Sequence, residues 1–203
     1  MNVPAIAKRT FDELRDRPEF LSLVQDVVKE LQQLPNSILR AQFIHNLVEE
    51  LNSEIFSNPL VQQLSPCKMG CSACCHTQVS ITEDESRLMA QLIQDGVEVD
   101  RNLLQLQAKA QNDSDAFYKI PYEERRCVFL NEEGACSIYE HRPSVCRTNA
   151  VLGDASQCET KTEIKPTRLV KTTQSDLVIY ASFLNTKDSG TLPYMLSKVI
   201  SAE

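Results

Sequence analysis

The chain has 203 residues, enough to bury a hydrophobic core as one domain, or as one domain with an appendage, without crosslinks. Asp and Glu number 28 against 21 Lys and Arg, and the net charge of -7 argues against nucleic acid and anionic membranes as main partners. No apolar stretch has the length of a signal peptide or of a membrane span, so we expect a cytoplasmic protein with no membrane partner.

The first third of the chain shows the periodicity of two long helices. Apolar residues recur at helical spacing over residues 10–34, and Pro35 is expected to end that helix. Asn36 or Ser37 can cap a second helix, which should end before Pro59. Because the turn between them is short, the two helices are expected to form an antiparallel hairpin.

The middle of the chain alternates loop and helix signals. Residues 59–76 are rich in Pro, Gly, Ser and Cys, and they are predicted to form a loop. Thr82 and Glu85 have the spacing of a capping box, which opens a helix that should stop at Gly96. A further helix is predicted over residues 100–117.

The last third is irregular before it becomes helical again. Within residues 126–147 two short apolar runs flank a glycine-containing turn, which predicts a β-hairpin. Pro143 then starts one expected helical turn that carries Cys146. Three more elements are expected after it, namely an extended piece at residues 167–172 and helices near residues 175–184 and 192–200.

These elements predict a mainly α fold with a small irregular Cys-rich core and a short β-hairpin. We divide the chain into an N-terminal helical hairpin, residues 1–66, and a cysteine-cluster metal-binding domain, residues 67–160. A C-terminal helical segment, residues 161–203, is expected to pack on that domain.

Eight cysteines are the most informative feature of the chain, and four of them stand close together in the run CKMGCSACC. In a reducing compartment clustered cysteines bind metal more often than they form disulfides. A disulfide scaffold is the alternative, but the adjacent pair Cys74 and Cys75 makes an awkward crosslink framework. The candidate metal ligands are Cys67, Cys71, Cys74, Cys75, Cys127, Cys136, Cys146 and Cys158.

The spacing of these thiols limits the kind of metal site. Thiolates are soft ligands that suit zinc, copper(I) and iron–sulfur centres. The two-residue gap between Cys71 and Cys74 lets both sulfurs point at one ion, whereas Cys74 and Cys75 should serve different sites, unless one of them is not a ligand. Eight cysteines allow two four-thiolate sites, or one such site with spare thiols. The uneven downstream gaps narrowly favour an iron–sulfur cluster over one or more zinc ions, and both stay open.

The motif CSACC, the stretch CVFLNEEGACSIYEHRPSVCR and the final Cys158 resemble the YkgJ-type CxxCxxCC family, whose label names zinc or iron chelation. The resemblance covers about residues 67–160. The chain departs from the family pattern in two places, because three residues instead of two separate Cys67 from Cys71 and Val128 replaces a proline. Besides the cysteines, the residues that match the pattern are Tyr139, Arg142, Pro143 and Arg147.

The resemblance implies metal chelation and leaves three functions open. The first is an iron–sulfur protein with a redox or metal-sensing role. The second is a zinc- or iron-chelating module for structure or delivery, without catalysis. The third is the accessory metal centre of a protein-modifying enzyme, because flagellin lysine methylases carry a related cysteine module. No catalytic residue is assigned, since the chain has no Ser-His-Asp order, phosphate-binding glycine loop or HExxH motif.

Several charged side chains stand close to the cysteines in sequence. Arg142 and Arg147 flank the seventh cysteine, where they can offset thiolate charge or form ion pairs with Asp and Glu. His76 is expected to be a loop residue or a hydrogen-bond donor behind the ligands, and His141 a turn residue. His45 is expected at the edge of the helical core.

Overall fold

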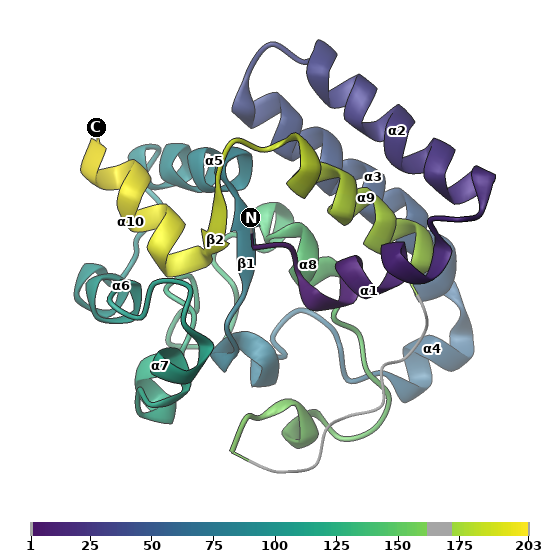
Figure 1. The fold of residues 1–203 in the computed structure, drawn as a ribbon. Helices are drawn as coiled ribbons and strands as arrows, with labels where there is room; N and C mark the ends of the chain where they lie inside the picture. Colours follow the sequence, from purple (N-terminus) through teal and green to yellow (C-terminus); the bar gives the residue numbers. More distant parts are fainter. Residues whose placement is uncertain (1, 162–171, 203) are drawn as a thin grey trace.

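The computed structural model describes residues 2–161 and 172–202 of the chain. Two groups of helices lie on either side of a small antiparallel sheet of two strands (Figure 1). The predicted fold class, mainly α with a Cys-rich irregular region and a short β element, is confirmed. The extended piece predicted at residues 167–172 lies outside the described residues except for Thr172.

The described elements follow one another in this order. The α-helices are α1 (Ala5–Leu14), α2 (Pro18–Gln33), α3 (Ser37–Ser57), α4 (Pro59–Leu64), α5 (Glu83–Gln94), α6 (Arg101–Ala108), α7 (Ser114–Tyr118), α8 (Ser144–Thr148), α9 (Thr173–Asn185) and α10 (Leu192–Ala202). The strands are β1 (Ser80–Thr82) and β2 (Ser189–Thr191), and the short 3₁₀ helices are η1 (Ala73–His76), η2 (Tyr122–Arg125), η3 (Tyr139–His141) and η4 (Ala155–Cys158).

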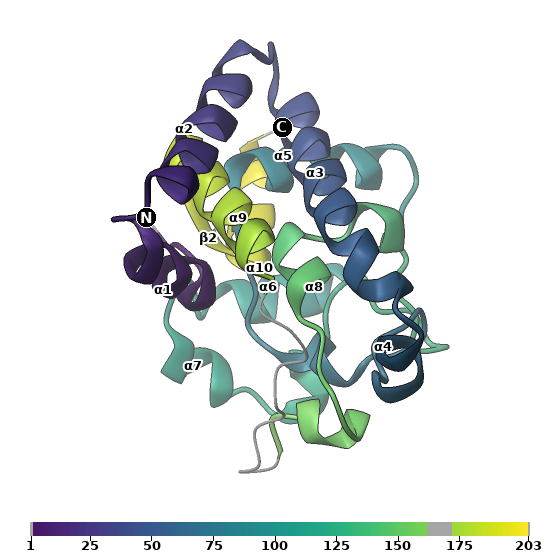
Figure 2. The same ribbon diagram turned by 90° about the vertical axis from the view of Figure 1, so that its right-hand side faces the viewer.

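The first hydrophobic core forms around α9. Helices α2 and α3 run antiparallel, as predicted, and α9 packs against α1, α2 and α3 (Figures 1 and 2). α9 is apolar on most of its circumference, which is typical of a helix surrounded by others. The buried side chains of this core include Val24, Val27, Leu31, Ile44, Val48, Leu177, Ile179 and Phe183.

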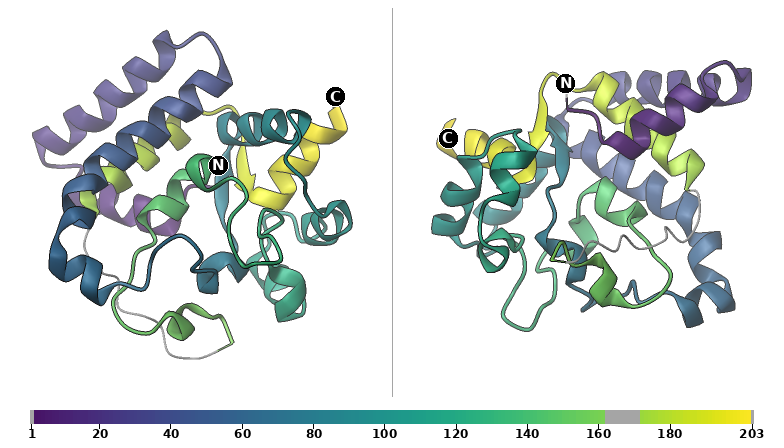
Figure 3. Two further views of the ribbon diagram at one scale, coloured as in Figure 1. Left: turned by 180° about the vertical axis from the view of Figure 1, so that it is seen from behind. Right: turned by 60° about the horizontal axis from the view of Figure 1, so that its bottom comes forward.

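The second core lies on the other side of the sheet, where α10 packs against α5 and α6 (Figure 3). The predicted capping box is present, because Thr82 Oγ1 accepts from the amide of Glu85 while the Glu85 carboxylate accepts from the amide of Thr82. The buried side chains of this core include Ile81, Met89, Leu103, Phe129, Ile138, Met195 and Leu196.

The single helix predicted over residues 10–34 is wrong, because α1 ends at Leu14 and α2 begins at Pro18. Proline disfavours helical dihedrals in the residue before it, and Arg17 is extended with φ -100° and ψ 113°. Pro18 therefore starts a new helix at a position where its missing N–H has no intrahelical acceptor to lose.

The helix predicted over residues 100–117 is also two helices, α6 and α7. Gln111 between them has φ 50°, which ends the helical path, and the Asp113 carboxylate accepts from the amide of Ala116 to start α7. The loop predicted at residues 59–76 likewise contains a short helix, α4, which Asn58 caps.

The β-structure joins distant parts of the chain. Within residues 126–147 the predicted hairpin is reduced to one bridge, between Leu130 and Cys136. The two strands come instead from β1 and β2, with Ile81 opposite Gly190. A Cβ on Gly190 would lie 2.6 Å from Asn112 Oδ1, so glycine here lets Asn112 approach β2 and accept from the amide of Thr191.

The expected three-part division of the chain stays a prediction. Contacts cross its boundaries, because α9 and α10 of the C-terminal part pack against helices of both other parts. The remaining predicted helices, at the expected places in the chain, are confirmed as α3, α5, α8, α9 and α10.

Replacing Leu177 by Ala tests the central position of α9. Leu177 is 0% exposed, so the change should lower the free energy of unfolding by about 2–5 kcal/mol through the cavity it leaves. Leu184 lies on the same helix at 43% exposure, and Leu184→Ala should cost less than about 0.5 kcal/mol. Urea unfolding measures both. Equal losses in the two variants would contradict the packing of α9 described above.

Candidate metal centre

All eight predicted ligands line one cavity of about 1250 Å³. Each of the eight is a free thiol, so the alternative of a disulfide scaffold is not supported. The cavity lies among the loops that connect the two helical cores, and the side chain of Phe129 from the second core forms part of its wall.

Backbone hydrogen bonds hold the upstream and downstream cysteine segments together. The amide of Cys127 donates to the carbonyl of Cys75 at 2.7 Å. The amide of Val151 donates to the sulfur of Cys67 at 3.3 Å. The two parts of the motif, more than fifty residues apart in sequence, therefore meet at the cavity as expected.

The loop before η1 reverses direction through a turn closed by the amide of Cys71 and the carbonyl of Lys68. Gly70 in this turn has φ 89°, which lies in the region that favours glycine, while no atom would obstruct a Cβ there. Gly70 is thus needed for the backbone path that places Cys71 on the cavity wall.

One group of thiols gathers around Cys158. Burial, and then the charges of the neighbouring thiols Cys74, Cys67 and Cys71, raise the pKa of Cys158 to about 11. The pKa of Cys71 is also raised, first by burial and then by Cys74 and Cys67. We call Cys67, Cys71, Cys74 and Cys158 the first thiol group.

The other thiols gather around Cys146. The thiol of Cys146 is accessible from the cavity but enclosed by protein, and this burial raises its pKa well above the ordinary value, with contributions from Cys74, Cys127 and Cys136. Burial also raises the pKa of Cys127 to about 12. The charges of Cys127 and Cys146 also raise the pKa of Cys75. We call Cys75, Cys127, Cys136 and Cys146 the second thiol group.

Cys74 and Cys75 lie where the two groups meet. A side-chain hydrogen bond between them lowers the pKa of Cys74 and raises the pKa of Cys75. A hydrogen bond with the side chain of Asn149 and the charge of Arg142 lower the pKa of Cys74 further. Cys74 is therefore the thiol of this pair that carries negative charge first.

Backbone amides stabilise the ionised form of several thiols. In three cases a hydrogen bond from the amide two residues later lowers the pKa of the cysteine, although burial outweighs it. Such N–H to sulfur bonds are found at thiolate ligands of metal centres. They stabilise the charge on sulfur and tune the reduction potential of the centre. The pairs are Ala73 with Cys71, Phe129 with Cys127, and Ile138 with Cys136.

The thiols surround the cavity without converging on one point. Within residues 2–161 and 172–202, no three cysteine, histidine or carboxylate side chains are close enough together to hold a single metal ion in this conformation. Coordination would therefore require side chains to rotate inward from the wall. The donor set itself, eight free thiols on one cavity, fits a soft metal.

Arg147 has a structural role. Its Nη1 lies 2.7 Å from a carboxylate oxygen of Glu49, and its Nη2 and Nε donate to the carbonyls of Glu140 and Arg142. Of the two expected roles for this arginine, the ion pair is the one observed.

Arg142 faces the cavity and acts on the thiols. Its guanidinium lies 4.0 Å from the ring centroid of Tyr139 and lines the cavity wall. The positive charge of Arg142 lowers the pKa of both Cys74 and Cys136. Both expected roles therefore apply to this arginine, because its Nη2 also lies 3.8 Å from a carboxylate oxygen of Glu49.

The three histidines are not part of the cavity wall. His76 stacks on Tyr122 with ring centroids 4.3 Å apart, and His141 ends η3, as a turn residue should. His45 was expected at the edge of the core, but it is only 3% exposed and its Nε2 lies 3.1 Å from Glu85 Oε1.

Arg125 is a cavity residue that the sequence did not indicate. It is 7% exposed, lies against the rings of Tyr118 and Tyr122, and donates from Nη1 to Thr160 Oγ1. A short pair of arginines outside any motif gives no sequence signal for this position, because its burial depends on aromatic residues folded around it.

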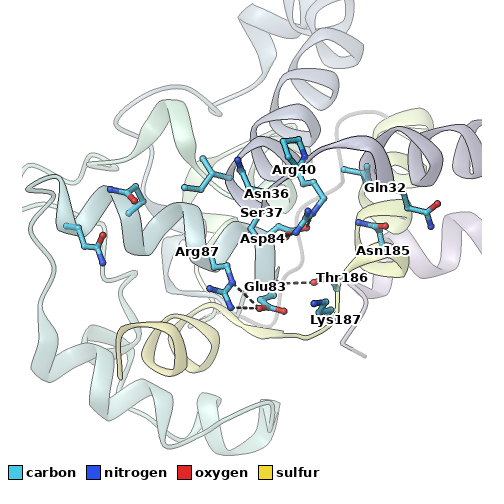
Figure 4. Close-up of a pocket in the computed structure, with 15 residues that line it drawn as sticks. Gln32, Asn36, Ser37, Arg40, Glu83, Asp84, Arg87, Asn185, Thr186 and Lys187 are labelled. Atoms are coloured by element: carbon cyan, nitrogen blue, oxygen red, sulfur yellow. Dashed lines mark hydrogen bonds and ion pairs between the residues drawn. The ribbon is translucent and has the colours of Figure 1, made fainter. Parts of the chain in front are cut away.

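A second cavity of about 670 Å³ lies over the start of α5 (Figure 4). Four of its charged side chains form two ion pairs. Arg40 pairs with Asp84, and Arg87 pairs with Glu83, at 2.7 Å in both cases. No cysteine lines this cavity in the described residues, so we assign the metal site to the first one.

Comparison with protein families agrees with the motif. The CxxCxxCC family, described as "Putative zinc- or iron-chelating domain", matches residues 66–167, half of the chain. The chain belongs to this family. Membership supports metal binding, with zinc or iron as the metals. No curated protein and no solved structure has significant similarity to the chain. In the described part of the chain no helix is both long and apolar enough to cross a membrane.

The unequal pKa values of Cys74 and its neighbours can be tested by alkylation. In the reduced, metal-free protein at neutral pH, iodoacetamide should modify Cys74 before Cys75 or Cys127, because the thiolate is the reactive form. Tandem mass spectrometry over time gives the order. In denaturant the cysteines should react at similar rates, because the order of modification depends on the fold. Equal rates in the folded protein would contradict the assignment of the negative charge to Cys74.

Proposed function

We propose that this chain binds metal through its eight cysteine thiolates, as an iron–sulfur protein with a redox or metal-sensing role. The observation that carries the proposal is the single cavity lined by eight free thiols from two distant segments. Thiolates are the soft donors that iron–sulfur centres and zinc use.

The thiols are suited to exchange protons for metal. Burial raises the pKa of most of them, so at neutral pH they are neutral when no metal is bound. A metal has to displace those protons, and its apparent affinity should increase with pH. The amide hydrogen bonds to sulfur and the charge of Arg142 then stabilise the resulting thiolates.

The neighbour relations among the thiols support two four-thiolate sites. The first thiol group would hold one centre and the second thiol group the other. This division places Cys74 and Cys75 at different sites, which suits adjacent residues whose side chains cannot easily face one ion.

The amide hydrogen bonds to sulfur support a cluster over a single ion. Such bonds are a means of tuning cluster potentials, and the cavity of about 1250 Å³ has room for a cluster. An iron–sulfur cluster would supply one-electron chemistry. The second candidate, a zinc- or iron-chelating module for structure or delivery, is favoured by the description of the family.

Metal and sulfide analysis of protein purified without oxygen decides between these functions. We expect a brown protein with a broad visible absorption band and with iron and acid-labile sulfide in comparable amounts. A colourless protein that contains zinc would support the chelating module instead. Neither metal in the purified protein, and none taken up on reconstitution, would overturn the proposal.

Single substitutions test the two thiol groups. Cys158→Ser removes a ligand from the first group and Cys136→Ser removes one from the second, so each should lower the metal:protein ratio by the content of one site. His141 lies outside the cavity wall, so the variant His141→Ala serves as the control. Complete loss of metal in both variants would indicate one shared site, and an unchanged ratio would remove both cysteines from the ligand set.

A further inference from the structure

Glu85 is a carboxylate almost completely withdrawn from water, with 2% exposure. A buried charge is costly unless hydrogen bonds replace its hydration. One oxygen, Oε2, accepts from the amide of Thr82 at 3.1 Å and completes the capping box. The other oxygen, Oε1, is not used for the cap and reaches two other elements of the fold.

Oε1 of Glu85 accepts from the amide of Ser144 at 2.7 Å. Ser144 is the first residue of α8, where amides lack intrahelical acceptors, and Pro143 before it has no N–H to offer. Glu85 therefore caps the beginning of the turn that carries Cys146, although it lies 59 residues earlier in the chain.

The carboxylate is itself fixed in place. His45 of α3 lies 3.1 Å from Oε1, and the neighbouring Asp84 is held by Arg40 of the same helix, as Figure 4 shows. Burial alone would raise the pKa of Glu85, but its hydrogen bonds with His45, Ser144 and Thr82 lower it, so the group is ionised at neutral pH.

The C-terminal end of α8 is attached to α3, the helix whose His45 also contacts Glu85. The carbonyl of Arg147 accepts from Asn52 Nδ2 at 3.2 Å, and the Arg147 guanidinium pairs with Glu49. Cys146 lies between these two attachments, and its thiol faces the cavity.

We propose that Glu85 is the positioning residue of Cys146: by holding the Ser144 amide it sets the direction of the Cys146 thiol and thereby the metal affinity of the second thiol group. This inference rests on the proposed metal binding. Hydrogen-bond partners behind metal ligands typically contribute about 10–100-fold to affinity. Glu85 is thus more than the cap of α5, because the same carboxylate connects α3 and α5 to a ligand.

The test compares Ser144→Pro with Ser144→Ala. Proline at the first helical position removes the N–H that Glu85 accepts, and the extended Pro143 before it suits a following proline. Ser144→Ala keeps the N–H and removes only a hydroxyl that has no hydrogen-bond partner among the described residues. Cobalt(II) is loaded into each protein, and its affinity is measured by competition with a chromophoric chelator.

Ser144→Pro should lower the cobalt affinity of one site about 10–100-fold and shift its thiolate-to-cobalt absorption bands, while Ser144→Ala keeps the wild-type affinity and spectrum. Glu85→Ala should give the same result as Ser144→Pro, because it removes the oxygen that accepts from the Ser144 amide. Thr82→Ala weakens the cap of α5 without touching the Ser144 contact and should leave the spectrum unchanged.

Thermal unfolding and circular dichroism establish which variants fold. If Glu85→Ala does not fold, the comparison of the two Ser144 variants still decides. A wild-type spectrum and affinity in folded Ser144→Pro would overturn the positioning role, and so would equal losses in Thr82→Ala and Glu85→Ala. If the wild-type chain binds no cobalt and takes up neither iron nor zinc on reconstitution, the proposed function fails instead.

Discussion

The cysteine segments have almost no regular structure of their own, so the position of every thiol depends on the helical cores to which these segments are attached. The loop of residues 65–72 lies between α4 and η1, and α8 is only five residues long. Such segments cannot bury enough apolar surface to order themselves. The first core around α9 and the second core around α10 supply the rigid frame, and the small sheet of β1 and β2 joins the two.

Polar contacts at the start of α5 connect the helical cores to the cysteine site. Glu83, Asp84 and Glu85 follow one another, yet each contacts a different element, because successive residues of a helix point in different directions. The Glu83 carboxylate pairs with Arg87 of its own helix. Asp84 pairs with Arg40 of α3, and Glu85 accepts from the amide of Ser144 in α8. A run of three acidic residues at a helix N-terminus thus does more than complement the helix dipole.

Electrostatics explains why a cavity of this kind is suited to metal. Eight thiols near one another repel when ionised, and burial raises the cost of each charge, so the metal-free site stays largely protonated. A bound cation favours the ionised thiolates instead, because its charge offsets theirs. The energy of metal binding and the order of the loops are consequently linked, as in other proteins whose ligands lie on short irregular segments.

The sequence alone determined the elements whose signals are local. Caps, prolines and helical periodicity located α3, α5, α9 and α10, and the cysteine spacing with its flanking motif identified the family. Local reasoning missed the break at Pro18, because apolar periodicity continues across it while the backbone does not.

Only the tertiary structure decided which residues meet. The pairing of β1 with β2, the meeting of the upstream and downstream cysteines at one cavity, and the contact of Glu85 with Ser144 all join residues that lie tens of positions apart. The burial of Arg125 likewise depends on how the chain folds around it. Spacing within one segment constrains the direction of neighbouring side chains, but the relative placement of distant segments depends on how the helices between them pack. For that reason the sequence named the candidate ligands, and the fold decided which residues surround them.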